Sequence, residues 1–216
     1  SNLKFKISNC EKGSTLVEVI VSISIISIFS IIVVSDFPKI RRQFAISRAS
    51  YALSQTVRRA EDLGFSGVQV TDSDGDIVET NGYGFYINTA ENEEEYIIYA
   101  DTDGGEDQEF SGGQSCLNDQ IPSGEDCIVE QTDITESEQE VYVKGIYRLS
   151  VCNFEDITFC PKTDWISINF MPPNPNIRIT NDQGDQESKI GIVLGARNDT
   201  MERVIFVNST GLIYVK

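Results

Sequence analysis

The sequence predicts an α+β protein in which one long N-terminal helix packs on a C-terminal antiparallel β-sheet head. A run of 19 residues from Leu16 to Val34 contains a single charge, Glu18. Apolar residues then recur at helical spacing as far as Leu63. After Gly64, short apolar runs are separated by Gly, Asp, Asn and Pro, a pattern typical of strands joined by turns.

The apolar run is long enough to cross a membrane. A helix of that length spans about 28 Å at 1.5 Å per residue, close to the ~30 Å hydrocarbon core of a bilayer. Lys4, Lys6 and Lys12 precede the run and predict a cytoplasmic N-terminal side. A signal peptide or simple anchor is the alternative, although a signal peptide has a shorter apolar core and a small-residue cleavage site after that core.

Residues 13–34 resemble the leader and first helix of the type IV prepilin family, which comprises type IV pilins and type II secretion pseudopilins. The shared pattern is K-G, then S-T-L-V-E, then a long apolar helix. The resemblance implies that a prepilin peptidase cleaves between Gly13 and Ser14 and that Ser14 becomes N-methylated. Two departures are Ser14, where Phe is commonest, and the absence of a proline late in the apolar run.

Glu18 is expected to act in assembly. A lone carboxylate in lipid is costly and normally has a partner. In the family, the glutamate at the fifth mature position pairs with the amino terminus of a neighbouring subunit, and Glu18 occupies that position. Such a pairing would supply the partner that a buried charge requires.

Four segments are predicted: a cleaved leader (1–13), a transmembrane and assembly helix (14–35), an amphipathic continuation of the helix (36–63) and a β-rich head (64–216). Asp36 and Pro38 suggest a kink or a re-start of the helix, and Gly64 is a fitting C-terminal stop. Ser24, Ser27 and Ser30 recur every third residue. Their hydroxyls either allow close helix–helix approach in lipid or bond back to their own helix.

Nine strands are predicted in the head, and residues 101–140 are predicted to form a long acidic loop. The expected strands are 68–70, 83–88, 96–100, 146–151, 165–170, 176–180, 189–196, 203–208 and 212–215, the last two joined as a hairpin. The amphipathic segment 47–60, the G-Y-G-F-Y-I segment at 82–87 and the closing segment 204–215 are also similar to H-type minor pseudopilins and related minor pilins.

The head is strongly acidic. The chain has a formal net charge of −17, which becomes −19 without residues 1–13, and residues 64–216 alone carry 29 acidic and 8 basic residues. Nucleic-acid binding depends on Lys and Arg at phosphates, so this charge argues against it. The same acidity also suits a solvated, soluble surface.

Four cysteines remain once Cys10 is lost with the leader. An even number in an exported domain favours disulfides. Three pairings are possible, and the local pairs Cys116–Cys127 and Cys152–Cys160 are favoured because short loops close most easily. The alternative is four thiolates around a structural metal, but the cysteine spacings do not fit the usual zinc pattern.

Two acidic turns are candidates for calcium binding. One surrounds Asp72, and the other provides Asp101, Asp103 and Asp107. Alternate carboxylates in a turn that contains glycine can surround Ca²⁺, although Asp-Gly is equally a plain hairpin signal. The chain has no histidine, the commonest general base, and it has no P-loop, so the sequence predicts no enzyme.

The sequence therefore predicts a structural subunit of a type IV pilus or a type II secretion pseudopilus. The expected partners are the prepilin peptidase, other pilin or pseudopilin subunits, and the inner-membrane assembly platform. The expected location is the inner membrane, as a single-pass protein with its head outside the cytoplasm, and then the filament. One alternative is a minor tip pilin whose head binds a ligand or adheres to a surface, and another is an uncleaved anchored protein unrelated to filaments.

Overall fold

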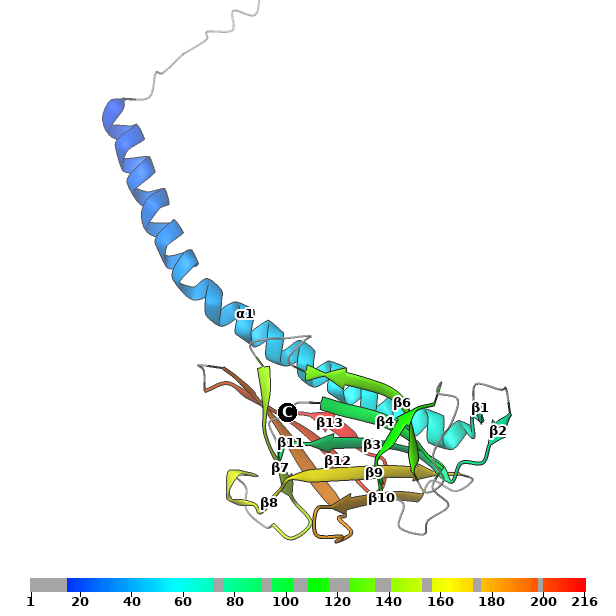
Figure 1. Ribbon diagram of the computed structural model, residues 1–216. Coiled ribbons are helices and arrows are strands. Elements are labelled where there is room, and N and C mark those ends of the chain that lie inside the picture. The colour runs from blue at the N-terminus through cyan, green and yellow to red at the C-terminus, as the bar shows by residue number, and fades with distance from the viewer. Residues whose placement is uncertain are drawn as a thin grey trace, which may run out of the picture. The chain divides into compact units, whose positions relative to one another are not determined.

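The computed structural model confirms the predicted α+β class, with one long helix followed by antiparallel-rich sheets (Figure 1). It describes residues 15–71, 76–90, 95–102, 109–116, 125–134, 141–152, 157–172, 176–197 and 200–216. By its internal packing, the chain separates into two compact units, Ser1–Arg41 and Arg42–Lys216. The predicted division of the helix into a membrane part (14–35) and an amphipathic part (36–63) stays a prediction.

Helix α1 (Leu16–Ser66) has 51 residues and continues through Pro38 without interruption. The expected end at Leu63 was wrong. Gly64 lies inside the helix, where an added Cβ would stand 2.6 Å from Cβ of Phe170. The helix ends before Gly67, whose φ of 60° is the left-handed conformation common after a helix. Gly64 thus permits close packing, and Gly67 supplies the stop.

Within the described part of the chain, the strands form three sheets. Their bounds are β1 (Val70–Thr71), β2 (Ile77–Val78), β3 (Gly82–Asn88), β4 (Glu95–Asp101), β5 (Gly113–Ser115), β6 (Asp126–Asp133), β7 (Val141–Arg148), β8 (Lys162–Thr163), β9 (Trp165–Met171), β10 (Asn176–Asn181), β11 (Lys189–Ala196), β12 (Glu202–Asn208) and β13 (Ile213–Val215). A 3₁₀ turn, η1 (Ile157–Phe159), precedes β8. The strand orders are β1-β2, β10-β9-β3-β4-β6-β5 and β13-β12-β11-β7-β8.

One hydrophobic core is enclosed by the second half of α1 and the inner faces of the two large sheets. Ile46, Leu53 and Val57 are buried on one stripe of the helix, the spacing of an amphipathic helix. They belong to the same cluster as Phe85 of the six-stranded sheet and Ile192 of the five-stranded sheet. The helix–sheet contact predicted from periodicity is therefore present.

The expectation of a loop throughout residues 101–140 was wrong. Strand β6 pairs antiparallel with β4, and the three-residue strand β5 pairs parallel with β6 at the edge of the sheet. The ladder supplies the backbone hydrogen bonds that a buried segment requires. Strand β7 also begins at Val141, earlier than the expected strand 146–151.

Candidate functional site: the N-terminal helix and its glutamate

The first turn of α1 carries a capping arrangement. The backbone N–H of Glu18 donates to the Thr15 hydroxyl at 3.3 Å, and the Val19 N–H donates to the Thr15 carbonyl at 3.2 Å. Thr followed three residues later by Glu is the capping-box spacing, which satisfies the free donors of a helix start. This geometry places Glu18 in the first turn of the helix. There, the positive end of the helix dipole also stabilises the negative charge of a carboxylate.

The helix beyond Glu18 is an exposed apolar surface. Every residue from Thr15 to Arg41 is exposed, and the large apolar side chains between Leu16 and Val34 range from 45% exposed at Val19 to 76% at Leu16. A continuous apolar surface of this extent does not persist in water. Among the described residues, α1 is the one helix long and apolar enough to cross a membrane.

Serine hydroxyls within the apolar segment bond to their own helix. Each donates to the carbonyl four residues earlier, at 2.7 to 2.8 Å: Ser22 to Glu18, Ser24 to Ile20, Ser27 to Ile23 and Ser30 to Ile26. These bonds satisfy the hydroxyls inside a lipid-like environment. Of the two roles expected for Ser24, Ser27 and Ser30, bonding back to the helix is therefore present in the structure.

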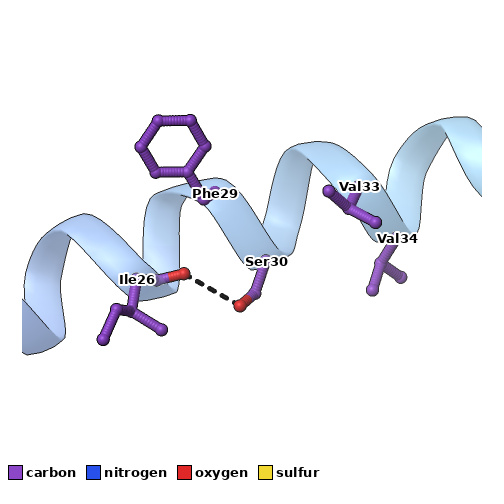
Figure 2. Close-up of a pocket in the computed structure, with 5 residues that line it drawn as sticks. All are labelled: Ile26, Phe29, Ser30, Val33 and Val34. Carbon is purple, nitrogen blue, oxygen red and sulfur yellow. Dashed lines mark hydrogen bonds between the residues drawn. The ribbon is translucent and has the colours of Figure 1, made fainter.

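Ser30 also shapes the helix surface. Its short side chain leaves an apolar depression among Ile26, Phe29, Val33 and Val34 (Figure 2). Because the hydroxyl is turned back to the Ile26 carbonyl, the depression presents mainly hydrocarbon. Small residues of this kind permit close approach of another helix in a membrane.

The predicted cleavage and methylation positions, Gly13 and Ser14, lie outside the described residues. Glu18, the residue predicted to act in assembly, lies at the start of the exposed helix. The assembly role of Glu18, the cleavage after Gly13 and the methylation of Ser14 stay predictions.

The four cysteines form the two local disulfides. The Sγ atoms of Cys116 and Cys127 are 1.91 Å apart, and those of Cys152 and Cys160 are 1.95 Å apart. Cys127 lies in β6, so the first bridge ties the segment after β5 to the edge of the six-stranded sheet. The second bridge closes the segment that contains η1. The sulfurs are thus held in pairs and do not surround a metal.

Asp101 is buried at the end of β4. Its carboxylate accepts hydrogen bonds from the side-chain amides of Asn169, at 2.8 Å, and Asn81, at 3.4 Å. Asp103 and Asp107, its predicted calcium-binding partners, lie outside the described residues, as does Asp72. Calcium binding stays a prediction, and the described residues hold no group of three or more Asp, Glu, Cys or His side chains arranged for a metal.

A second buried carboxylate, Asp126, lies near Asp101 and was not anticipated from the sequence. It accepts the backbone N–H groups of Thr102, at 3.2 Å, and Ser111, at 2.9 Å. Burial and the charges of Asp126 and Asp101 raise the pKa of Tyr99, whose hydroxyl lies 2.7 Å from that of Ser167. Asp126 thus ties Thr102 and Ser111 to the start of β6. The sequence signal for this carboxylate was its position next to Cys127.

Fold and helix together define a class: a single-pass, membrane-anchored protein with an apolar N-terminal helix and a helix-plus-sheet head. Residues 8–34 match the family model described as the prokaryotic N-terminal methylation motif. This match supports a likeness to type IV pilins and pseudopilins in the N-terminal segment of the chain. A search of curated proteins finds no match, and a search of solved structures finds none either.

The motif implies processing by a peptidase and assembly with other pilin-type subunits. It points to a structural subunit, which is not an enzyme. It does not distinguish a pilus from a secretion pseudopilus, and the similarity of the head to H-type minor pseudopilins stays a prediction.

Proposed function

We propose that this chain is a filament subunit that is cleaved between Gly13 and Ser14, N-methylated at Ser14, and assembled through α1. The observation that carries the proposal is the match of residues 8–34 to the methylation motif on a helix whose apolar side chains are exposed. A filament core of packed helices covers such a surface, as does the membrane before assembly. The filament is a type IV pilus or a type II secretion pseudopilus.

The proposal gives Glu18 the role of setting the register between subunits. Glu18 lies in the first turn of α1, three residues after Thr15 and four residues along the sequence from the new amino terminus at Ser14. A carboxylate inside a helix bundle in lipid requires a cationic partner, and the methylated amino terminus of a neighbouring subunit supplies one. Assembly takes place on the inner-membrane platform, with the acidic head outside the cytoplasm.

The amino terminus of the protein tests the proposal. Mass spectrometry should be applied to the chain from membranes and from sheared surface material of the source cell. A chain that starts at methylated Ser14 in the sheared fraction is the expected result. An intact leader, found in membranes alone although the prepilin peptidase is active, would overturn the proposal and leave a plain anchored protein.

A pair of variants tests Glu18 separately. Glu18→Gln keeps the size and the hydrogen-bonding capacity but removes the charge, and we expect a loss of about tenfold or more in sheared filament protein, because the intersubunit charge pair is gone. Asp36→Asn removes a carboxylate beyond the apolar run and should assemble as the unaltered chain does. Normal assembly of Glu18→Gln would remove the pairing role while leaving the filament proposal intact.

The second candidate is a minor tip pilin whose head binds a ligand or adheres to a surface. Abundance separates the two: a major subunit dominates sheared filaments, whereas a tip protein is scarce in them. Both candidates share the leader, the helix and the role of Glu18.

A further inference from the structure

The outer face of the five-stranded sheet carries aromatic side chains on the side formed by β11, β12 and β13. Strand register defines one row across these strands through Gly191, Phe206 and Tyr214. The residues that flank this row in sequence, such as Ile192 and Ile205, lie in the hydrophobic core. Because successive side chains of a strand point to opposite faces, the side chains of Phe206 and Tyr214 point away from the core.

Two lysines lie on the same face, one on each side of this row. Lys189 lies two residues before Gly191 on β11 and therefore also points outward. Lys216 lies two residues beyond Tyr214 and exchanges backbone hydrogen bonds of 2.9 and 3.0 Å with Val204 of β12. Within the described part of the chain, the ion pairs involve neither lysine. Both ammonium groups can therefore pair with an anionic ligand.

The aromatic rings form a fixed platform in the row between the two lysines. The rings of Phe206 and Tyr214 are stacked, with centroids 4.7 Å apart and planes 14° apart. The Lys189 ammonium lies 5.1 Å from the centre of the Phe206 ring, a cation–π contact that holds the charge over the ring. Phe206 is half-buried, whereas Tyr214 is 39% exposed. Tyr214 therefore offers the more accessible ring of the platform.

The surroundings of Tyr214 are apolar and held in place. Leu212, 55% exposed, lies two residues before Tyr214 and extends the apolar surface. Between them, the carbonyl of Ile213 accepts a 2.7 Å hydrogen bond from Arg58 of α1, which anchors β13. A surface that is already fixed loses less entropy when a ligand binds. We call the set Lys189, Phe206, Leu212, Tyr214 and Lys216 the lysine–tyrosine face.

The charge of the lysine–tyrosine face is opposite to that of the head as a whole. Residues 64–216 carry 29 acidic and 8 basic residues. Along the outward positions of β11, β12 and β13, the acidic residue is Glu202, and Lys144 of β7 pairs with it. Charges act over about 8 Å at physiological ionic strength. A ligand on this face is therefore attracted by the two nearby lysines more than it is repelled by distant carboxylates.

A ligand that matches this face has an anionic group next to a surface that packs on an aromatic ring. Acidic polysaccharides have both, because their carboxylates pair with ammonium groups and the C–H groups of a sugar ring lie against the electron-rich face of an aromatic ring. Nucleic acids carry a denser charge and depend on many phosphate contacts with Lys and Arg. Two lysines on a head with 29 acidic residues suit the sparser charge of a polysaccharide better.

We propose that the lysine–tyrosine face binds an acidic polysaccharide. Carboxylates of uronic acid residues pair with Lys189 and Lys216, and a sugar ring lies on Tyr214. The binding requires the head of a single copy, so it goes beyond assembly through α1 and does not depend on that assembly. A filament would repeat the face along its length and increase the avidity for a polymer.

Binding of defined polymers to the full chain in detergent micelles tests the proposal. Polygalacturonate and alginate, which are both polymers of uronic acids, should bind at about 0.15 M salt, as measured by biolayer interferometry. Dextran has sugar rings without charge, and poly-L-glutamate has carboxylates without sugar rings. Each of these two controls should bind about tenfold or more weakly than polygalacturonate, because each lacks one half of the recognised chemistry.

Lysine variants locate the charge contacts. Combining Lys189→Gln with Lys216→Gln should weaken polygalacturonate binding by about tenfold or more, because two charge pairs are lost. Arginine at the same two positions should retain binding within about threefold, since the charge is kept. Lys162→Gln is the matched control. The Lys162 ammonium also lies over a ring, 5.3 Å from the centre of Tyr147, but on β8 at the opposite edge of the sheet, so binding should not change.

Tyrosine variants locate the ring contact. Tyr214→Ala should weaken polygalacturonate binding by about fivefold, because the surface under the sugar ring is lost. Tyr214→Phe keeps the ring and should bind as the unaltered chain does. Loss of binding in Tyr214→Phe equal to that in Tyr214→Ala would show that the ring face is not the contact and would overturn the stacking.

The remaining outcomes also decide the proposal. Failure of both uronic acid polymers to bind would overturn it, as would equal binding of poly-L-glutamate or binding that survives the loss of both lysines. Tighter binding of a single-stranded oligothymidylate, or of vesicles that contain phosphatidylglycerol, would assign the face to nucleic acid or lipid instead. Because the micellar chain is not assembled, none of these outcomes bears on the filament function, which the amino terminus of the protein tests separately.

Discussion

Arg58 of α1 donates a 2.7 Å hydrogen bond from Nη2 to the carbonyl of Ile213, 155 residues later in the chain. The contact joins the helix to β13, the last strand of the five-stranded sheet. It satisfies a carbonyl at a sheet edge, where the ladder supplies no partner on the open side. The beginning and the end of the head are thereby fastened to each other.

Replacing Arg58 should loosen this attachment. We expect Arg58→Ala to lower the free energy of unfolding by about 1–2 kcal/mol, because a charge-assisted hydrogen bond is lost. Urea unfolding of the full chain in detergent micelles, followed by near-ultraviolet circular dichroism, measures the change. Arg59→Ala is the matched control: its ion pair with Glu130 spans 2.6 Å but involves an arginine side chain that is 61% exposed, so its loss should cost under about 1 kcal/mol.

A buried ion pair fastens the turn between β10 and β11. Arg148 binds Glu187 through Nε and Asp185 through Nη2, and the Glu187 side chain is 1% exposed. Removing Glu187 leaves a largely buried guanidinium with less compensation, so Glu187→Gln should cost about 2–4 kcal/mol. Asp185→Asn, at a side chain 57% exposed, should cost under about 1 kcal/mol. Equal effects of the two variants in urea unfolding would contradict this assignment.

The disulfide between Cys152 and Cys160 holds η1 over the outer face of the five-stranded sheet. We expect the double change Cys152→Ser and Cys160→Ser to lower the unfolding free energy by about 2–4 kcal/mol, through the loss of the cross-link. It should also increase proteolysis between Leu149 and Pro161, which limited digestion and mass spectrometry can locate. An unchanged cleavage pattern would show that Ile157 holds the segment without the bridge.

Burial and the neighbouring charge of Asp62 raise the pKa of Glu61, and Arg58 opposes them. A carboxyl whose pKa is raised by folding contributes stability below its unfolded pKa and loses that contribution as the pH rises through the folded value. The ionised group is therefore unfavourable at neutral pH. We expect Glu61→Gln to melt higher than the unaltered chain at pH 7 and to lose that advantage as the pH falls through the raised pKa of Glu61 toward the ordinary value of about 4.5. An advantage that grows toward low pH would reverse the sign of this argument.

Calcium removal tests the prediction for Asp101, Asp103 and Asp107. If the turn holds Ca²⁺, excess chelator should lower the melting temperature of the head, and added Ca²⁺ should restore it. Asp103→Asn should remove the response to chelator while leaving the bonds from Asn169 and Asn81 to Asp101. A melting curve indifferent to chelator would dismiss calcium and leave Asp101 as a buried hydrogen-bond acceptor.

Local signals in the sequence were sufficient for the helix and for most strands. Of the apolar residues that recur at helical spacing, Leu53 and Val57 are buried as expected, whereas Phe44 and Tyr51 are 71% and 65% exposed. The apolar runs at 189–196 and 203–208 were predicted to be strands. They correspond to β11 and β12, whose bounds agree with the prediction to within one residue. Each of these elements repeats its pattern over several residues, so that periodicity alone identifies it.

Elements that depend on distant partners were missed. Strand β6 contains Asp126, Glu130 and Asp133 and has no apolar alternation strong enough to distinguish it from a loop. It is a strand because it pairs with β4 and is fastened through Cys127 to Cys116. Gly64 was likewise taken for the residue that ends the helix. Its actual role is to let α1 pack closely on Phe170 of β9, and that contact depends on how the helix meets the sheet.

The sequence by itself determined the membrane-length helix, the leader pattern before it, Glu18 in its first turn and the α+β class. These features depend on composition and short-range spacing, which are properties of the sequence itself and require no long-range contacts. The tertiary structure alone decided that Asp101 and Asp126 are buried and that Arg58 reaches Ile213. The reason is physical: a two-residue period specifies which side chains alternate along a strand, but long-range pairing and register decide which strands become neighbours and which face meets the core.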